Sequence, residues 1–200
     1  MSFLNQIPLP NVCPVELILG IAILNKLSGL FGILSIFTGH PLDFIQWLLY
    51  ITSLLMLPYY FLGASNIRNP KILEHSVILI IYSIDTLTSL GFILWFAGEW
   101  FINEDVTAEI KPGEDYSKSA SQNYEYGWIF LMTFVINLSR FYFNFILLSF
   151  YIKLIKFNKI QGIDYLKIEG DELNLKNKYF WQRWNYKIQI ESYKFLERTL

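Results

Sequence analysis

The sequence has few charged residues and a single cysteine, and each shortage excludes a class of protein. Charged side chains make up 16% of the 200 residues and hydrophobic ones 54%, whereas a water-soluble domain usually carries about 25% charged residues. The lone Cys13 excludes an intrachain disulfide and a thiolate metal cluster. The net charge of −1 gives no signal for nucleic acid as a partner. An aromatic content of 18%, in turn, is too high for a disordered chain.

Apolar residues, by contrast, are abundant and gather in long blocks. The blocks cover residues 15–37, 43–62, 72–101 and 127–155. Each reaches the ~20 residues that an α-helix needs to cross ~30 Å of hydrocarbon, and none alternates with a period of two as barrel strands do. The sequence therefore predicts an all-α integral membrane protein, with a bundle of four transmembrane helices in residues 1–155 and a tail at 156–200.

The distribution of charge around the blocks predicts the orientation. Ten of the sixteen Lys and Arg residues lie from Lys153 onward, and the positive-inside rule places such a tail in the cytosol. With four spans, the N-terminus is then cytosolic as well. The connection 102–125 is rich in Asp and Glu, which is typical of a solvated lumenal loop.

Three charged residues stand near the middle of the predicted spans: Lys26, Asp85 and Arg140. A charge at mid-bilayer costs about 2.5–3.5 kcal/mol, so such residues usually face protein or water. We expect Asp85 to lie in the bundle interior and to pair with Arg140 or Lys26, with Asn144 joining the same polar network. The alternative is that these groups only fix the register of the helices.

Two further sets of residues predict surfaces for contact with other groups. Ser28, Gly29 and Gly32 in the first block are small enough for another backbone to approach closely. The fourth block carries a collar of aromatic residues that includes Phe141, Tyr142 and Phe145. Because a four-helix bundle cannot bury every face, part of this collar is expected to contact lipid tails or a partner.

A complete catalytic set is absent from the pattern. The chain has two histidines, His40 and His75, and the predicted topology puts them on opposite sides of the membrane. A lipid phosphotransferase that uses two histidines on one phosphorus is therefore disfavoured. Cys13 has no histidine near it in sequence, and no cluster has the spacing of a metal site. We expect a non-catalytic protein without cofactor or metal.

Two connecting segments complete the prediction. Residues 38–42 form a tight lumenal turn that holds His40, and Asp43 is placed to cap the second helix. In the tail, residues 179–187 interleave aromatic and basic side chains, among them Trp181, Arg183 and Trp184. This stretch suits an amphipathic helix at the anionic cytosolic leaflet or a surface that packs on a partner, and both readings stay open.

Several runs of residues together resemble the regulatory subunit of fungal inositolphosphorylceramide synthase. They are Glu16-Leu17-Ile18-Leu19-Gly20-Ile21-Ala22-Ile23-Leu24-Asn25-Lys26, Phe37-Thr38-Gly39-His40-Pro41-Leu42-Asp43-Phe44, Ile84-Asp85-Thr86, Arg140-Phe141-Tyr142-Phe143-Asn144-Phe145-Ile146-Leu147 and Leu175-Lys176-Asn177-Lys178. The likeness extends from the first block into the tail, and it is most specific in the first and fourth blocks.

This resemblance implies a small multi-pass Golgi membrane protein that binds a multi-span catalytic subunit and supports its activity and location. The catalytic subunit would move phosphoinositol from phosphatidylinositol to ceramide with its own histidines and aspartate. Our own hypothesis is that the first and fourth helices supply the interface, through Ser28, Gly29, Gly32, Phe141, Tyr142 and Phe145.

The resemblance also implies that vesicle coats recognise the tail, and Trp181, Arg183 and Trp184 are the candidate sorting segment. Two other functions stay open beside the regulatory one. The chain could be a standalone four-span trafficking or cargo adaptor, or it could be a lipid phosphotransferase itself.

Overall fold

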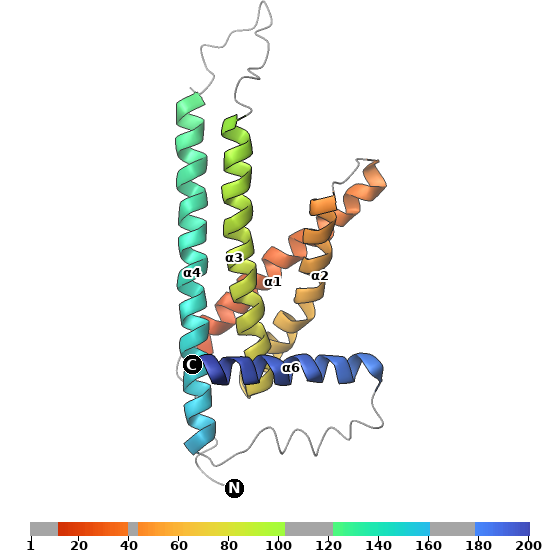
Figure 1. Cartoon of the computed structure of the whole chain (residues 1–200), viewed down its shortest axis with the longest axis vertical. Coiled ribbons are helices and arrows are strands. Elements are labelled where there is room, and N and C mark those ends of the chain that lie inside the picture. The colour runs from red at the N-terminus through yellow and green to blue at the C-terminus, as the bar shows by residue number, and fades with distance from the viewer. Residues whose placement is uncertain (1–11, 40–43, 103–121, 161–178) are drawn as a thin grey trace, which may run out of the picture. The chain divides into compact units, whose positions relative to one another are not determined.

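The computed structural model describes residues 12–39, 44–102, 122–160 and 179–200, and the regular structure in these ranges is helical. Figure 1 shows the elements, which are α1 (Val12–Leu34), the short 3-10 helix η2 (Ser35–Thr38), α2 (Phe44–Ser65), α3 (Ile72–Ile102), α4 (Gln122–Ile160) and α6 (Phe180–Thr199). Four of them, α1 to α4, are long and apolar enough to cross a membrane. The predicted all-α fold with four membrane-spanning helices is confirmed.

Local sequence explains where α1 begins and where η2 ends. Pro14 lies in the first turn of α1, where a missing backbone N–H removes no intrahelical hydrogen bond. At the other end, Gly39 follows η2 with a φ of +76°. Only glycine adopts this left-handed conformation without a steric penalty from Cβ, so the helical path stops there.

The turn between α2 and α3 is short and internally hydrogen-bonded. The backbone N–H of Asn69 donates to the carbonyl of Asn66 at 3.0 Å, and the Asn66 side-chain amide donates to Glu74 Oε2 at 2.9 Å. Lys71 Nζ lies 3.7 Å from the other Glu74 oxygen. Glu74 is in the first turn of α3, where a carboxylate interacts favourably with the helix dipole. These contacts hold α2 and α3 antiparallel.

The described residues divide into two compact units. The first draws on Met1–Tyr82 and Phe145–Leu200, so it holds α1, α2, the start of α3, the end of α4 and α6; the second is Ser83–Asn144. The buried core of the first unit is apolar and aromatic, and its largest fully buried side chains include Tyr60, Tyr151, Phe150, Ile18, Leu19 and Leu73. The second unit consists of the facing parts of α3 and α4.

Within the first unit, α6 runs across α3 and α4 rather than along them (Figure 1). The hydroxyl of Ser76 on α3 contacts the backbone carbonyl of Gln189 on α6 at 3.5 Å. Tyr186 and Leu196 of α6 are buried. The basic tail therefore contains a helix that packs against the membrane-spanning part of the chain.

Candidate intramembrane contact sites

Two glycines of α1 lie in close contact with α2. A Cβ added to Gly29 would lie 2.9 Å from Ser53 Cβ, and one added to Gly32 would overlap the ring of Tyr50. Both neighbours belong to α2. Small residues let membrane helices approach closely, and the groups that approach here are chiefly the Ser53 and Tyr50 side chains of α2 in the same chain.

The remaining small residue of that predicted surface behaves differently. Ser28 is exposed, and its hydroxyl donates to the Asn25 carbonyl one turn earlier at 2.5 Å. This hydrogen bond lies within α1. Of the three small residues, Ser28 is the one whose side chain stays available to a second molecule.

Gly63 of α2 forms a second close contact that the sequence reasoning missed. It is buried, a Cβ there would overlap Ile78 Cδ1 of α3, and Leu19 Cδ1 of α1 is 3.5 Å from the same point. Gly63 thus lies where three helices meet. A single glycine in an apolar helix has no distinguishing pattern, so only its neighbours reveal the role.

A ladder of polar contacts joins α3 and α4 in the second unit. Arg140 Nη1 lies 3.6 Å from Asp85 Oδ2, and the same guanidinium nitrogen donates to the hydroxyl of Ser89. One turn along α4, the Ser83 hydroxyl donates to Asn144 Oδ1 at 3.0 Å. The contacts run from Ser83 to Ser89 along α3 and from Asn144 back to Arg140 along α4, as expected for antiparallel helices.

The charged pair of this ladder is largely shielded, since the Arg140 and Asp85 side chains are 22% and 17% exposed. An unpaired charge at this depth would cost about 2.5–3.5 kcal/mol, whereas a polar contact between membrane helices adds on average about 0.6 kcal/mol. The pairing of Asp85 with Arg140 therefore acts chiefly by offsetting the cost of placing two charges in the membrane.

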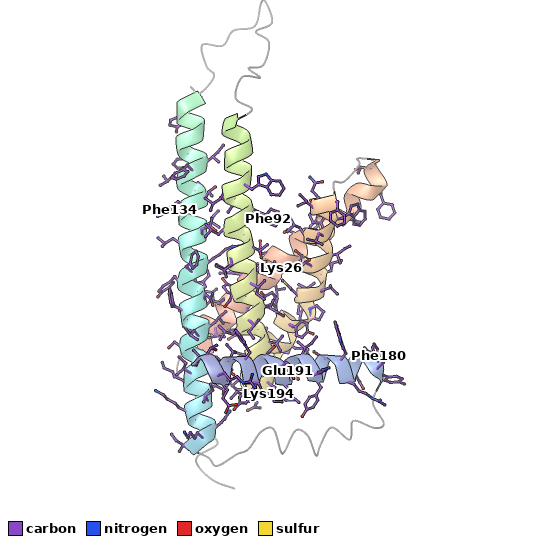
Figure 2. The ribbon with its side chains drawn as sticks, viewed as in Figure 1. Lys26, Phe92, Phe134, Phe180, Glu191 and Lys194 are labelled. Atoms are coloured by element: carbon purple, nitrogen blue, oxygen red, sulfur yellow. The ribbon has the colours of Figure 1, made fainter. Side chains whose placement is uncertain are left out.

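Lys26, the other cation considered as a partner for Asp85, lies on α1 in the first unit (labelled in Figure 2). Asp85 and Arg140 belong to the second unit. The Lys26 side chain is buried, with 6% of the residue exposed. Of the four residues in the predicted network, the structure brings Asp85 to Arg140 and Asn144 to Ser83.

His75 is a packed core residue. It is 3% exposed, its Nδ1 lies 3.1 Å from the Lys71 carbonyl, and its ring is 5.3 Å from that of Phe150 with a tilt of 48°. His40 and Asp43 lie outside the described residues. Among the residues that are described, no group of three or more His, Cys, Asp or Glu could hold a metal ion.

The aromatic collar of α4 is largely uncovered. Tyr142 is 62% and Phe145 67% exposed, while Phe141 is half-buried. Farther toward the start of the helix, Trp128, Phe130 and Phe134 are exposed as well (Figure 2 labels Phe134). Exposed apolar side chains of this size need lipid or a protein partner to cover them.

Comparison with known proteins shows the same family along most of the chain. Residues 2–118 match the model of the family described as inositolphosphorylceramide synthase subunit Kei1. The inositol phosphorylceramide synthase regulatory subunit KEI1 of Saccharomyces cerevisiae is 43% identical over 218 residues, covering 100% of this chain and 95% of that protein. The regulatory subunit kei1 of Schizosaccharomyces pombe is 32% identical over 162 residues, covering 77% of this chain and 67% of that protein.

No solved structure matches the chain, so the family assignment rests on the family model and these two relatives. Both are named as regulatory subunits, which agrees with the non-catalytic character expected from the sequence. The resemblance stated from the residues alone is confirmed: the chain belongs to the family of the inositolphosphorylceramide synthase subunit Kei1.

Proposed function

We propose that this chain is the non-catalytic regulatory subunit of an inositolphosphorylceramide synthase, and that it binds and activates a multi-span catalytic subunit in the Golgi membrane. The observation that carries the proposal is the 43% identity to the regulatory subunit of Saccharomyces cerevisiae over the whole chain. That identity covers α4 and α6, which lie beyond the residues matched by the family model.

The exposed aromatic face of α4 supports a docking role in the membrane. Tyr142 and Phe145 are more than half exposed, and Phe141 lies beside them on the helix. Bulky aromatic side chains contribute much of the binding energy at protein interfaces. Ser28 of α1 is an additional candidate contact, whereas Gly29 and Gly32 act by holding α1 against α2.

Activation follows if the chain binds one arrangement of the catalytic subunit better than others. A binding partner shifts a conformational equilibrium by its difference in affinity for the two states. The catalytic subunit then performs the transfer of phosphoinositol from phosphatidylinositol to ceramide, and this chain contributes no reacting group.

Reconstitution tests the assignment. The chain alone, the catalytic subunit alone and their complex would be purified and assayed for phosphoinositol transfer to ceramide. We expect the highest activity in the complex, no activity in the isolated chain, and no effect of His40→Ala on the complex. Transfer by the isolated chain that is lost in His40→Ala would instead make this protein the enzyme.

The tail carries a second candidate function, sorting of the complex by a vesicle coat. Trp181, Arg183 and Trp184 are exposed on α6, as a recognition segment has to be. The double variant Trp181→Ala/Trp184→Ala separates the two roles, because both side chains are exposed and the buried side of α6 stays intact. If the segment only sorts, the variant complex leaves the Golgi but keeps its specific activity; if it also activates, both are lost.

A further inference from the structure

Helix α6 presents three different faces along its 20 residues. At 100° per residue, the buried residues Tyr186 and Leu196 share one side with Gln189, whose carbonyl contacts Ser76 of α3. This side is occupied by the rest of the first unit. The other two sides carry the aromatic and basic side chains that make the tail unusual.

An aromatic edge and a basic edge flank the buried side, each roughly a third of a turn away from it and from each other. The aromatic edge holds Trp181, Trp184 and Phe195, which are 64%, 62% and 58% exposed. The basic edge holds Arg183, Lys187 and Lys194, all exposed, and Figure 2 labels Lys194 on this helix. The apolar and charged groups are therefore segregated on the outer surface.

The position of α6 along the spans matches the depth of a membrane interface. The candidate span of α3 begins at Ile72, and the contact with α6 is at Ser76, about 6 Å farther along at 1.5 Å per residue. Helices that lie in the interface bury their apolar side by about 5–10 Å. Because α6 runs across α3 and α4 (Figure 1), it lies along the membrane plane wherever those helices cross the bilayer.

The charges around α6 favour an anionic surface. The helix carries four basic residues against Glu191 and Glu197, a net charge of +2. Arg68 and Lys71, both exposed, immediately precede the span that α6 crosses, and Lys71 is paired with Glu74. Basic residues next to an anionic leaflet bind it electrostatically, and tryptophan prefers the level of the headgroups.

We propose that α6 is an interfacial helix that binds anionic phospholipid at this end of the spans. Its aromatic edge enters the outer acyl region, its basic edge meets the phosphates, and its third side is fixed to α3. Lipid then covers Trp181, Arg183 and Trp184, so this proposal is an alternative to their recognition by a vesicle coat. The proposal requires only that α3 and α4 cross a membrane, so it stands or falls separately from the proposed catalytic partner.

Site-directed spin labelling in nanodiscs measures the depth of the helix. The full chain carrying Cys13→Ser would be labelled at Ile188→Cys, on the aromatic edge, or at its neighbour Lys187→Cys, on the basic edge. We expect the label at 188 to be reached better by oxygen, and the label at 187 by a water-soluble nickel chelate. Equal access of the chelate to both labels means that α6 stands off the bilayer, and this overturns the proposal.

The preference of the chain for anionic over neutral lipid measures how much the basic edge contributes to lipid binding. Association with spin-labelled phosphatidylserine relative to phosphatidylcholine would be compared for the unaltered chain and for Arg183→Gln/Lys187→Gln/Lys194→Gln. We expect the preference for phosphatidylserine to fall by about threefold or more in this variant and at high salt. The matched variant Glu191→Gln/Glu197→Gln, on the same helix, is expected to raise it. An unchanged preference in the basic-edge variant overturns the assignment of anionic lipid.

Discussion

The α1–α2 hairpin and the α3–α4 ladder hold neighbouring helices together by opposite means. In the hairpin, Gly29 and Gly32 leave room for the Ser53 and Tyr50 side chains of the neighbouring helix. In the ladder, Arg140, Asp85 and their neighbours connect two helices through polar side chains. Lipid provides no hydrophobic drive for helix association, so packing and hydrogen bonds are the two means available. The hairpin is sensitive to added volume, and the ladder is sensitive to a charge that loses its mate.

The two units also differ in how far they cover their own apolar surface. The first unit buries large residues such as Tyr60, Phe150 and Tyr151 almost completely. Along the α4 part of the second unit, by contrast, Trp128, Phe130 and other large side chains are exposed. The second unit therefore depends more on lipid or on a partner.

The largest effect on stability is expected from Arg140→Leu. The substitution removes the guanidinium that lies 3.6 Å from the Asp85 carboxylate, and a charge at this depth that loses its counter-charge costs up to about 2.5–3.5 kcal/mol. Equilibrium unfolding of the purified chain in mixed micelles measures the loss. A cost below about 1 kcal/mol would mean that water reaches Asp85 and that the ladder is weaker than the hairpin.

The double variant Arg140→Leu/Asp85→Asn is the control for this effect. It removes both charges at once, so part of the lost stability is expected to return. If the double variant is as unstable as the sum of the two single variants, Asp85 is not the energetic mate of Arg140.

A somewhat smaller loss is expected from Gly32→Leu in the hairpin. The new side chain would occupy the space of the Tyr50 ring, and overpacking of this kind costs typically about 1–3 kcal/mol. Gly20→Leu on the same helix is the matched control, because nothing lies within 4 Å of a Cβ at that position. Equal losses at 20 and 32 would show that helix propensity or lipid contact, and not the clash with the Tyr50 ring of α2, sets the cost.

The sequence predicted the four membrane helices because block length and hydrophobicity are local properties. It left open which cation pairs with Asp85, since Lys26 and Arg140 stand at similar depth in their helices. The small residues of α1 predicted a close approach by another helix. They did not show which helix, because Gly29 and Gly32 are equally suited to contact α2 or a second protein. The packed side of α6 depends on Ser76, more than a hundred residues earlier in the chain, and local pattern carries no such information.

The hydrogen bond between Ser83 and Asn144 is expected to contribute little to stability. Ser83→Ala removes one hydrogen bond to Asn144, and such bonds average about 0.6 kcal/mol. A double-mutant cycle with Asn144→Ala isolates this coupling. Ser139→Ala provides a comparison within α4, because that hydroxyl donates to the Val135 carbonyl of its own helix. Coupling above about 1.7 kcal/mol would place this rung on a par with the charged pair.

The smallest effect on the isolated chain, and the largest on its association, is expected at the exposed face of α4. Tyr142→Ala removes a side chain that is 62% exposed, so stability should change by less than about 0.5 kcal/mol. Co-purification with the catalytic subunit should nevertheless fall, since the lost ring would leave a gap in the interface. Phe130→Ala, on the same helix and 68% exposed, separates a local docking face from a general loss of apolar surface. If both variants bind as the unaltered chain does, lipid covers this side of α4 and the partner contacts another helix.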